Sequence, residues 1–171
     1  ATFDPATYVP IFGDRVEVEG PLVSGTLEAI RVESEDEDPN QRNVRIEAAV
    51  TSIDNVARTL VVLGVTVAAD GETVLEDNSS VEDENFRFTE LLVGDFVEVQ
   101  GIDDGGANVR ALSIVRENAT AGVDDVRLEG PVTGFDMATP TLEILGQSVP
   151  LYTGTLYFDD LGVLRTEDQF F

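Results

Sequence analysis

Apolar and polar residues alternate with a period of two along much of the chain. In residues 93–101, valines alternate with charged or polar residues between an initial Gly-Asp pair and a final glycine, and residues 12–20 repeat this pattern. Such alternation between glycine-containing turns is typical of a β-strand with one buried face. The pattern predicts an all-β protein that contains at least two copies of this strand.

The chain also repeats over a longer distance. Residues 44–54 resemble residues 126–136, at an offset of 126 − 44 = 82, and the match continues without a gap to Asp77 against Asp159. The rest of the unit repeats toward the start of the chain. Matching turns and apolar positions indicate copies of one structural unit. We predict the back half of a unit at residues 1–34, a complete unit at residues 44–117 and the front half of a unit at residues 124–171.

The complete unit is predicted to contain five strands. The apolar parity slips in the last of them, between Ala111 and Leu112, which indicates a β-bulge that bends a long strand. Three strands, a short helical connection and two more strands is the order of a five-stranded OB-type barrel. We therefore expect two OB-like five-stranded β-barrel units, with another small closed barrel as the alternative. The predicted strands are residues 44–54, 58–63, 65–76, 95–100 and 107–116, with a short helix or turn in residues 86–92.

The two half-units cannot close separately, because each would expose unpaired strand edges. Three arrangements remain open at this point. The halves meet within one chain as a permuted second barrel, or they meet between chains from head to tail, or the sequence is a slice of a longer tandem array.

Composition excludes several kinds of chemistry. The chain has no Cys and no His, and all ten of its basic residues are Arg. It therefore lacks the residues for a Ser-His-Asp triad, a cysteine nucleophile, a zinc site of thiolates or imidazoles, or a Schiff base. We expect a protein that is not an enzyme and has no cofactor other than, at most, a hard cation such as calcium.

The formal net charge of −24 narrows the choice of partners. A surface this acidic repels the phosphates of nucleic acid and of anionic membranes, so neither is expected as a partner. No stretch approaches 18 consecutive apolar residues, so no membrane span is predicted. The same acidity fits an acidic secreted protein or a chain adapted to high salt.

Calcium is the best metal candidate, because carboxylates cluster in two turn-rich segments. Neither segment has the ligand spacing of an EF-hand loop, and charged runs of this kind are commonly solvated loops. The candidate ligands are Asp36 and Asp38 in the first segment and Asp103 and Asp104 in the second.

Aromatic residues near the two ends suggest an assembly interface. Phe170 and Phe171 are costly to leave in water, because each would gain about 1.5 to 3 kcal/mol by full burial. We expect them to insert into a neighbouring barrel or into the N-terminal half of the chain, so the candidate interface consists of Tyr8, Phe12, Phe170 and Phe171.

From Val50 to Ile114 the strand and turn positions resemble a widespread bacterial repeat domain that is classified only as a domain of unknown function. The similarity extends over most of the chain, as one whole copy and two half copies. It implies an OB-like barrel and an extracellular or cell-surface location, because that family occurs mostly in exported proteins, often as tandem repeats. It implies no catalytic residues.

The leading hypothesis is a non-enzymatic, exported structural protein that self-associates. In this hypothesis tandem OB-like barrels build a surface or extracellular assembly, and strand complementation between half-units gives a head-to-tail filament. The alternative is a module that binds a carbohydrate, a peptide or calcium.

Overall fold

The computed structural model describes residues 13–35, 42–118, 126–136 and 138–166. The described residues form strands and turns with one short 3-10 helix, η1 (Phe88–Glu90), so the predicted all-β class is confirmed. The strands are β1 (Arg15–Gly20), β2 (Leu22–Val23), β3 (Thr26–Leu27), β4 (Ala29–Glu35), β5 (Asn43–Asp54), β6 (Thr59–Val62), β7 (Val65–Ala68), β8 (Val74–Asp77), β9 (Phe96–Asp103), β10 (Asn108–Glu117), β11 (Val126–Asp136), β12 (Thr141–Ile144), β13 (Gln147–Phe158) and β14 (Leu164–Arg165).

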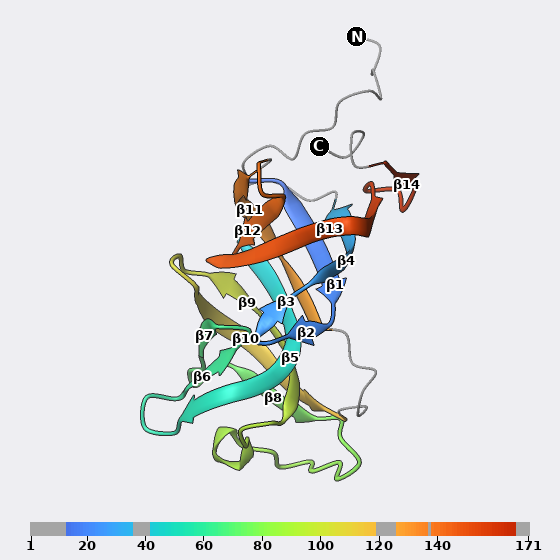
Figure 1. The fold of residues 1–171 in the computed structure, drawn as a ribbon. Helices are drawn as coiled ribbons and strands as arrows, with labels where there is room; N and C mark the ends of the chain where they lie inside the picture. Colours follow the sequence, from blue (N-terminus) through green and yellow to red (C-terminus); the bar gives the residue numbers. More distant parts are fainter. Residues whose placement is uncertain (1–12, 36–41, 119–125, 137, 167–171) are drawn as a thin grey trace.

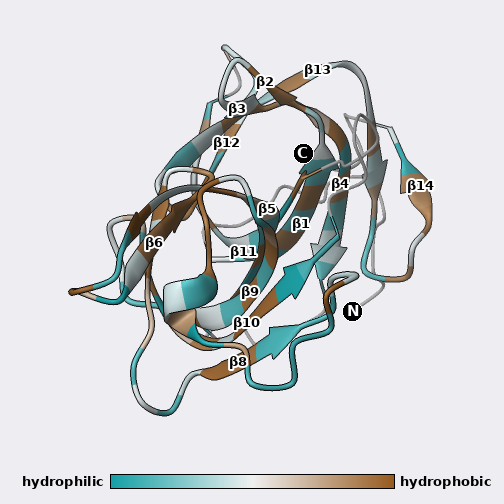
Figure 2. Cartoon of the chain, turned by 90° about the horizontal axis from the view of Figure 1, so that it is seen from below, coloured by the Kyte–Doolittle hydropathy of each residue, from teal (hydrophilic) through white to brown (hydrophobic). Residues whose placement is uncertain are grey.

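Five strands from the middle of the chain close into a barrel, which we call the first ring. Its pairing order is β5-β6-β7-β10-β9 and back to β5. All neighbours are antiparallel except β7 and β10, which are parallel, and β8 continues the parallel pairing along β10. Figure 2 shows this ring from below, with hydrophobic and hydrophilic positions alternating along its strands.

The second ring combines the two ends of the described chain. Its pairing order is β11-β12-β13-β4-β1 and back to β11. Again one pair is parallel, β4 with β13, and the others are antiparallel. Because β1 and β4 come from the start of the chain and β11 to β13 from its end, these pairings close the ring within one chain (Figure 1).

The two rings are joined through β5 and β11, which pair antiparallel with Ile46 opposite Leu128. This joint makes a continuous antiparallel sheet of six strands, in the order β10-β9-β5-β11-β1-β4. The buried hydrophobic residues of both rings form one cluster. The core is therefore continuous across the joint.

Matching turns connect the second and third strands of each ring. Leu63 and Gly64 have positive φ values of 49° and 74°, and Leu145 and Gly146 have 50° and 70°. Two successive positive φ values are the requirement of the tightest β-hairpins, and leucine rarely adopts them. Both leucines are buried, so the packing of their side chains offsets the backbone strain.

The β-bulge predicted in the last strand of the complete unit is confirmed. The register of β9 against β10 shifts between Ala111 and Ser113, which leaves Leu112 unpaired and exposed. The bulge lets one strand serve two neighbours in succession, because β10 pairs with β7 before it and with β8 after it.

No helix in the described part of the chain is long and apolar enough to cross a membrane.

Candidate functional site

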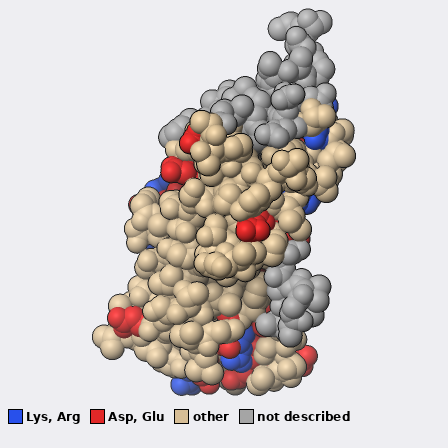
Figure 3. Space-filling model, viewed as in Figure 1, with Lys and Arg blue, Asp and Glu red and all other residues tan. Residues whose placement is uncertain are grey.

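The surface where the two rings meet is poor in charge on one side. A hollow there is lined by the β2-β3 hairpin, by Leu63 from the first ring and by the start of β13. Figure 3, drawn in the view of Figure 1, shows a largely uncharged area over these elements, with an acidic patch within it. The polar groups in the lining are uncharged hydroxyls and one amide, from Thr26, Ser148 and Gln147. This surface offers neutral contacts in a strongly acidic protein.

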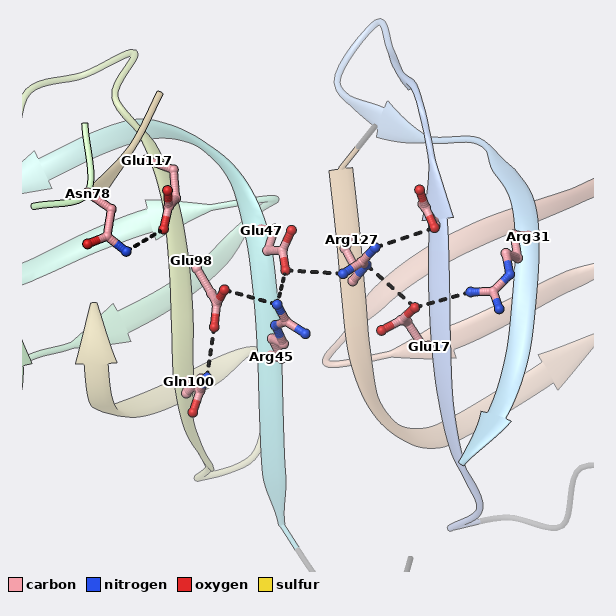
Figure 4. A network of polar contacts seen from close by, with 10 residues as sticks. Glu17, Arg31, Arg45, Glu47, Asn78, Glu98, Gln100, Glu117 and Arg127 are labelled. Atoms are coloured by element: carbon pink, nitrogen blue, oxygen red, sulfur yellow. Dashed lines mark hydrogen bonds and ion pairs between the residues drawn. The ribbon is translucent and has the colours of Figure 1, made fainter. Parts of the chain in front are cut away.

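The six-stranded sheet carries a ladder of alternating charges across the joint (Figure 4). Arg45 of β5 lies 2.6 Å from Glu47 and 3.0 Å from Glu98 of β9. Arg127 of β11 lies 3.3 Å from Glu47 and 3.5 Å from Glu17 of β1. Glu47 therefore links the two arginines, and the ion pairs run without a break from one ring to the other.

The ladder continues to the outer strands and to the edge of the joint. Arg31 of β4 lies 3.5 Å from Glu17. Arg15 of β1, whose side chain is 3% exposed, pairs with Glu129 and donates a hydrogen bond to the carbonyl oxygen of Asn43 on β5. Arg15 thus fastens β1 to the strand that belongs to the first ring.

Burial and ion pairing shift the pKa values of the glutamates in the ladder in opposite directions. Burial raises the pKa of Glu17, and the repulsion from Glu129 adds to that effect, while Arg127 opposes it. Burial would also raise the pKa of Glu98, but hydrogen bonds from Gln100 and Arg45 outweigh it and the pKa is lowered. The glutamates of the ladder are partly exposed, and such ion pairs typically contribute between zero and about 1 kcal/mol each. The ladder aligns the strands.

A second charged site anchors the long segment that follows β8. The Asp77 carboxylate accepts hydrogen bonds from Nε and Nη2 of Arg116 on β10, at 3.0 Å and 2.5 Å. It also accepts the backbone N–H groups of Ser79 and Asp83, both at 3.0 Å. The guanidinium of Arg116 lies over the ring of Phe86, 4.4 Å from its centroid. Asp77 therefore holds the start of the segment against the barrel that Phe86 helps to fill.

Asp77→Asn should weaken this anchor in a pH-dependent way. The hydrogen bond from Arg116 holds the pKa of Asp77 well below its usual range, against the opposing effect of burial. A lowered pKa contributes stability above the ordinary aspartate pKa of about 3.9, and the contribution is lost as the pH falls below it. We expect the difference in unfolding free energy between wild type and variant to be largest near neutral pH and to shrink below about pH 4.

Urea unfolding across this pH range measures that difference. Asp160→Asn is the control, because Asp160 is an exposed carboxylate close to the equivalent turn of the second ring. A difference for Asp77→Asn that does not change with pH would show that the charge of Asp77 is not what anchors the segment.

The predicted calcium ligands are only partly covered by the structure. Asp103 is the last residue of β9 and Asp104 follows it in the turn before β10, and the Asp103 carboxylate accepts the N–H of Gly105 at 2.7 Å. Among the described residues no group of three or more acidic side chains is placed to hold a metal ion. Outside the described residues lie Asp36 and Asp38 and the whole predicted assembly interface of Tyr8, Phe12, Phe170 and Phe171. Calcium binding stays a prediction.

Sequence reasoning missed both the charge ladder and the uncharged surface. The ladder has a visible signal, because Arg and Glu alternate two residues apart in Arg45-Ile46-Glu47 and in Arg127-Leu128-Glu129, so that each pair falls on one face of its strand. The sequence also indicates the uncharged surface, because it contains long stretches without any charged residue. Neither signal says which strands become neighbours.

Comparison with known proteins identifies one family. Residues 47–115 match the family described as a domain of unknown function (DUF5666). The matched residues run from the middle of β5 to near the end of β10, so they include most of the first ring. No curated protein and no solved structure matches the chain. The resemblance to a domain of unknown function is thus confirmed for this stretch.

Proposed function

We propose that this chain is a non-enzymatic, exported structural protein, built from two OB-type barrels of one repeat and used as a unit of a cell-surface or extracellular assembly. The observation that carries the proposal is the joint between β5 and β11, which unites two rings in one sheet and one core. In a compact unit of this kind nearly all strands are paired, so its outer faces are the surfaces that remain for contact with other molecules.

The strand order supports the OB-type assignment. In the first ring the first strand pairs with the second and the fourth, and the third strand is parallel to the fifth. The segment between the third and fourth strands carries η1, and its buried residues include Phe86, Phe88 and Leu91. This order agrees with the five-stranded Greek-key arrangement of OB barrels and so supports the proposed assignment.

Equivalent contacts in the two rings support the repeat of about 82 residues. Gly94 donates its N–H to the carbonyl of Val50 at 2.8 Å, and Gly13 donates to Val132 at 3.0 Å. Val50 and Val132 differ by 132 − 50 = 82 in sequence position. In this reading β1 takes the place of β9, and the front half of one unit is completed by the back half of another.

The same pairings support two routes of assembly. Within one chain they give a closed particle whose outer faces make the contacts. Between chains they give a head-to-tail filament, in which β1 and β4 of one molecule complete β11 to β13 of the next. Both routes make self-association the expected partnership, and the net charge of −24 argues against nucleic acid.

Light scattering and electron microscopy over a concentration series test this proposal. We expect oligomers or filaments that grow with protein concentration. A chain that stays monodisperse and monomeric at the highest attainable concentration, with and without calcium, would contradict a structural role.

A second candidate function, binding of a small neutral ligand, is favoured by the hollow between the rings. Its lining offers the side chains of Thr26, Ser148 and Gln147, and OB barrels bind ligands on their second and third strands and the adjoining loops. A rise in melting temperature with an added neutral oligosaccharide or uncharged peptide would support this candidate.

A further inference from the structure

Three segments that meet at the hollow contain no charged residue at all. They are residues 20–27, residues 59–69 and residues 144–158. The chain as a whole is 26% charged, so stretches of this length without Asp, Glu or Arg are unusual in it. Their side chains are mainly Thr, Ser, Val and Leu.

The fold brings these three segments together. The hollow between the rings is lined by Gly25 to Leu27 from the first segment, Leu63 from the second, and Gln147 to Val149 from the third. The remaining lining residue, Leu128, is part of the buried core. We call the exposed surface of the three segments the neutral face. Figure 3 shows a largely uncharged area around β2, β3 and the start of β13, interrupted by an acidic patch.

The neutral face also exposes apolar side chains. Leu22 and Val23 on β2 are 41% and 44% exposed, and Tyr152 on β13 is 47% exposed. The β2-β3 hairpin pairs only with itself in the described residues, with Leu22 opposite Leu27 and Val23 opposite Thr26. It therefore presents an apolar edge that no other described strand covers.

We propose that the neutral face is the surface through which two copies of this chain associate. This inference rests on the structural role proposed above and names the surface that serves it. Two molecules that each carry a net charge of −24 repel one another, and at physiological salt the repulsion acts over a Debye length of about 8 Å. Contact through the neutral face would bring in the Glu28 carboxylate, which accepts a hydrogen bond from the Tyr152 hydroxyl, but no carboxylate from the three segments themselves, while other surfaces would bring more like charges together.

The net charge of the protein also favours a second copy of this chain over a basic partner at the neutral face. A cationic partner would be drawn to the strongly acidic surfaces, whereas the three segments of the neutral face carry no carboxylate and only adjoin that of Glu28 beside Tyr152. A second copy of this chain is not attracted to the acidic surfaces, and its apolar side chains gain contact at the neutral face. The interface then has an unusual salt dependence, because added salt screens the repulsion between the copies and weakens no ion pair in the contact.

Sedimentation velocity over a concentration series, at low and high sodium chloride, tests this inference on the full chain. Val23→Glu places a carboxylate in the neutral face, and Val81→Glu makes the same change at an exposed valine in the acidic segment after β8. We expect association of the wild type to strengthen with salt, Val23→Glu to weaken it by about tenfold or more, and Val81→Glu to leave it unchanged. Circular dichroism spectra of both variants should match the wild type.

The outcomes separate this inference from the proposed function. A wild type that never associates contradicts the structural role itself. Association that Val23→Glu does not weaken, or that salt dissolves, leaves the structural role standing and overturns the assignment of the neutral face. A monomer whose melting temperature rises with a neutral oligosaccharide, but not after Val23→Glu, would overturn association and assign the face to a ligand.

Discussion

Replacing Gly101 by alanine is expected to lower the free energy of unfolding by about 3 kcal/mol, and replacing Gly20 by alanine is expected to have a similar effect. A Cβ atom on Gly101 would lie 2.5 Å from Cγ1 of Val109 and 2.7 Å from the carbonyl oxygen of Arg110, and one on Gly20 would overlap the carbonyl oxygen of Glu28. The two carbonyl oxygens are backbone atoms, which cannot turn aside as a flexible side chain can. The strands must separate to admit the new methyl group.

The two glycines occupy matching places in the two rings. Gly101 lies opposite Ala111, just before the bulge in β10, and Gly20 ends β1 where the chain turns into the β2-β3 hairpin. In each ring the glycine lets two backbones come close where a strand bends. Similar losses at both sites would support the view that the rings are copies of one unit.

Urea unfolding of Gly20→Ala and Gly101→Ala measures these losses. Gly71→Ala is the matched control, because a Cβ atom there meets nothing within 4 Å. We expect the control to change stability by less than about 0.5 kcal/mol. A loss at Gly101 with none at Gly20 would argue that the second ring does not close as the first does.

The first ring was the most predictable part of the fold. Apolar patterning predicted most of its strands, and the slip of parity at Leu112 predicted the bulge, because these patterns follow from the two-residue period of a strand. The single strand expected at residues 65–76 is instead two strands, β7 and β8. The segment near Phe88 was expected to be a short helix or turn and is η1. The repeat and the OB-type assignment stay predictions that the pairings support.

The pairing of β5 with β11 and the neutral face could not be predicted from the alternation of apolar residues. The pairing of β5 with β11 joins segments about a repeat apart, and alternation says which face of each strand is buried but not which strand lies beside it. The ladder through Arg45 and Arg127 depends on that pairing. Candidate residues in the acidic segments were chosen by composition alone, and composition does not distinguish a ligand from a solvated carboxylate.

Ile46→Ala and Leu128→Ala are each expected to lower the free energy of unfolding by about 2 to 5 kcal/mol, because large side chains removed from a packed core leave cavities. Both side chains are fully buried, and they lie opposite each other across the joint. Leu161→Ala, at a side chain that is 80% exposed, is the control and should be nearly neutral.

The stronger test is how the two core substitutions combine. If the rings share one core, Ile46 and Leu128 support each other, and the double variant should lose less than the sum of the single losses by about 0.5 kcal/mol or more. The chain should also unfold in a single transition, because neither ring keeps a complete core once the joint opens. Additive losses with two separate transitions would mean that the rings are independent domains held side by side, and the six-stranded sheet would then not be the unit on which an assembly is built.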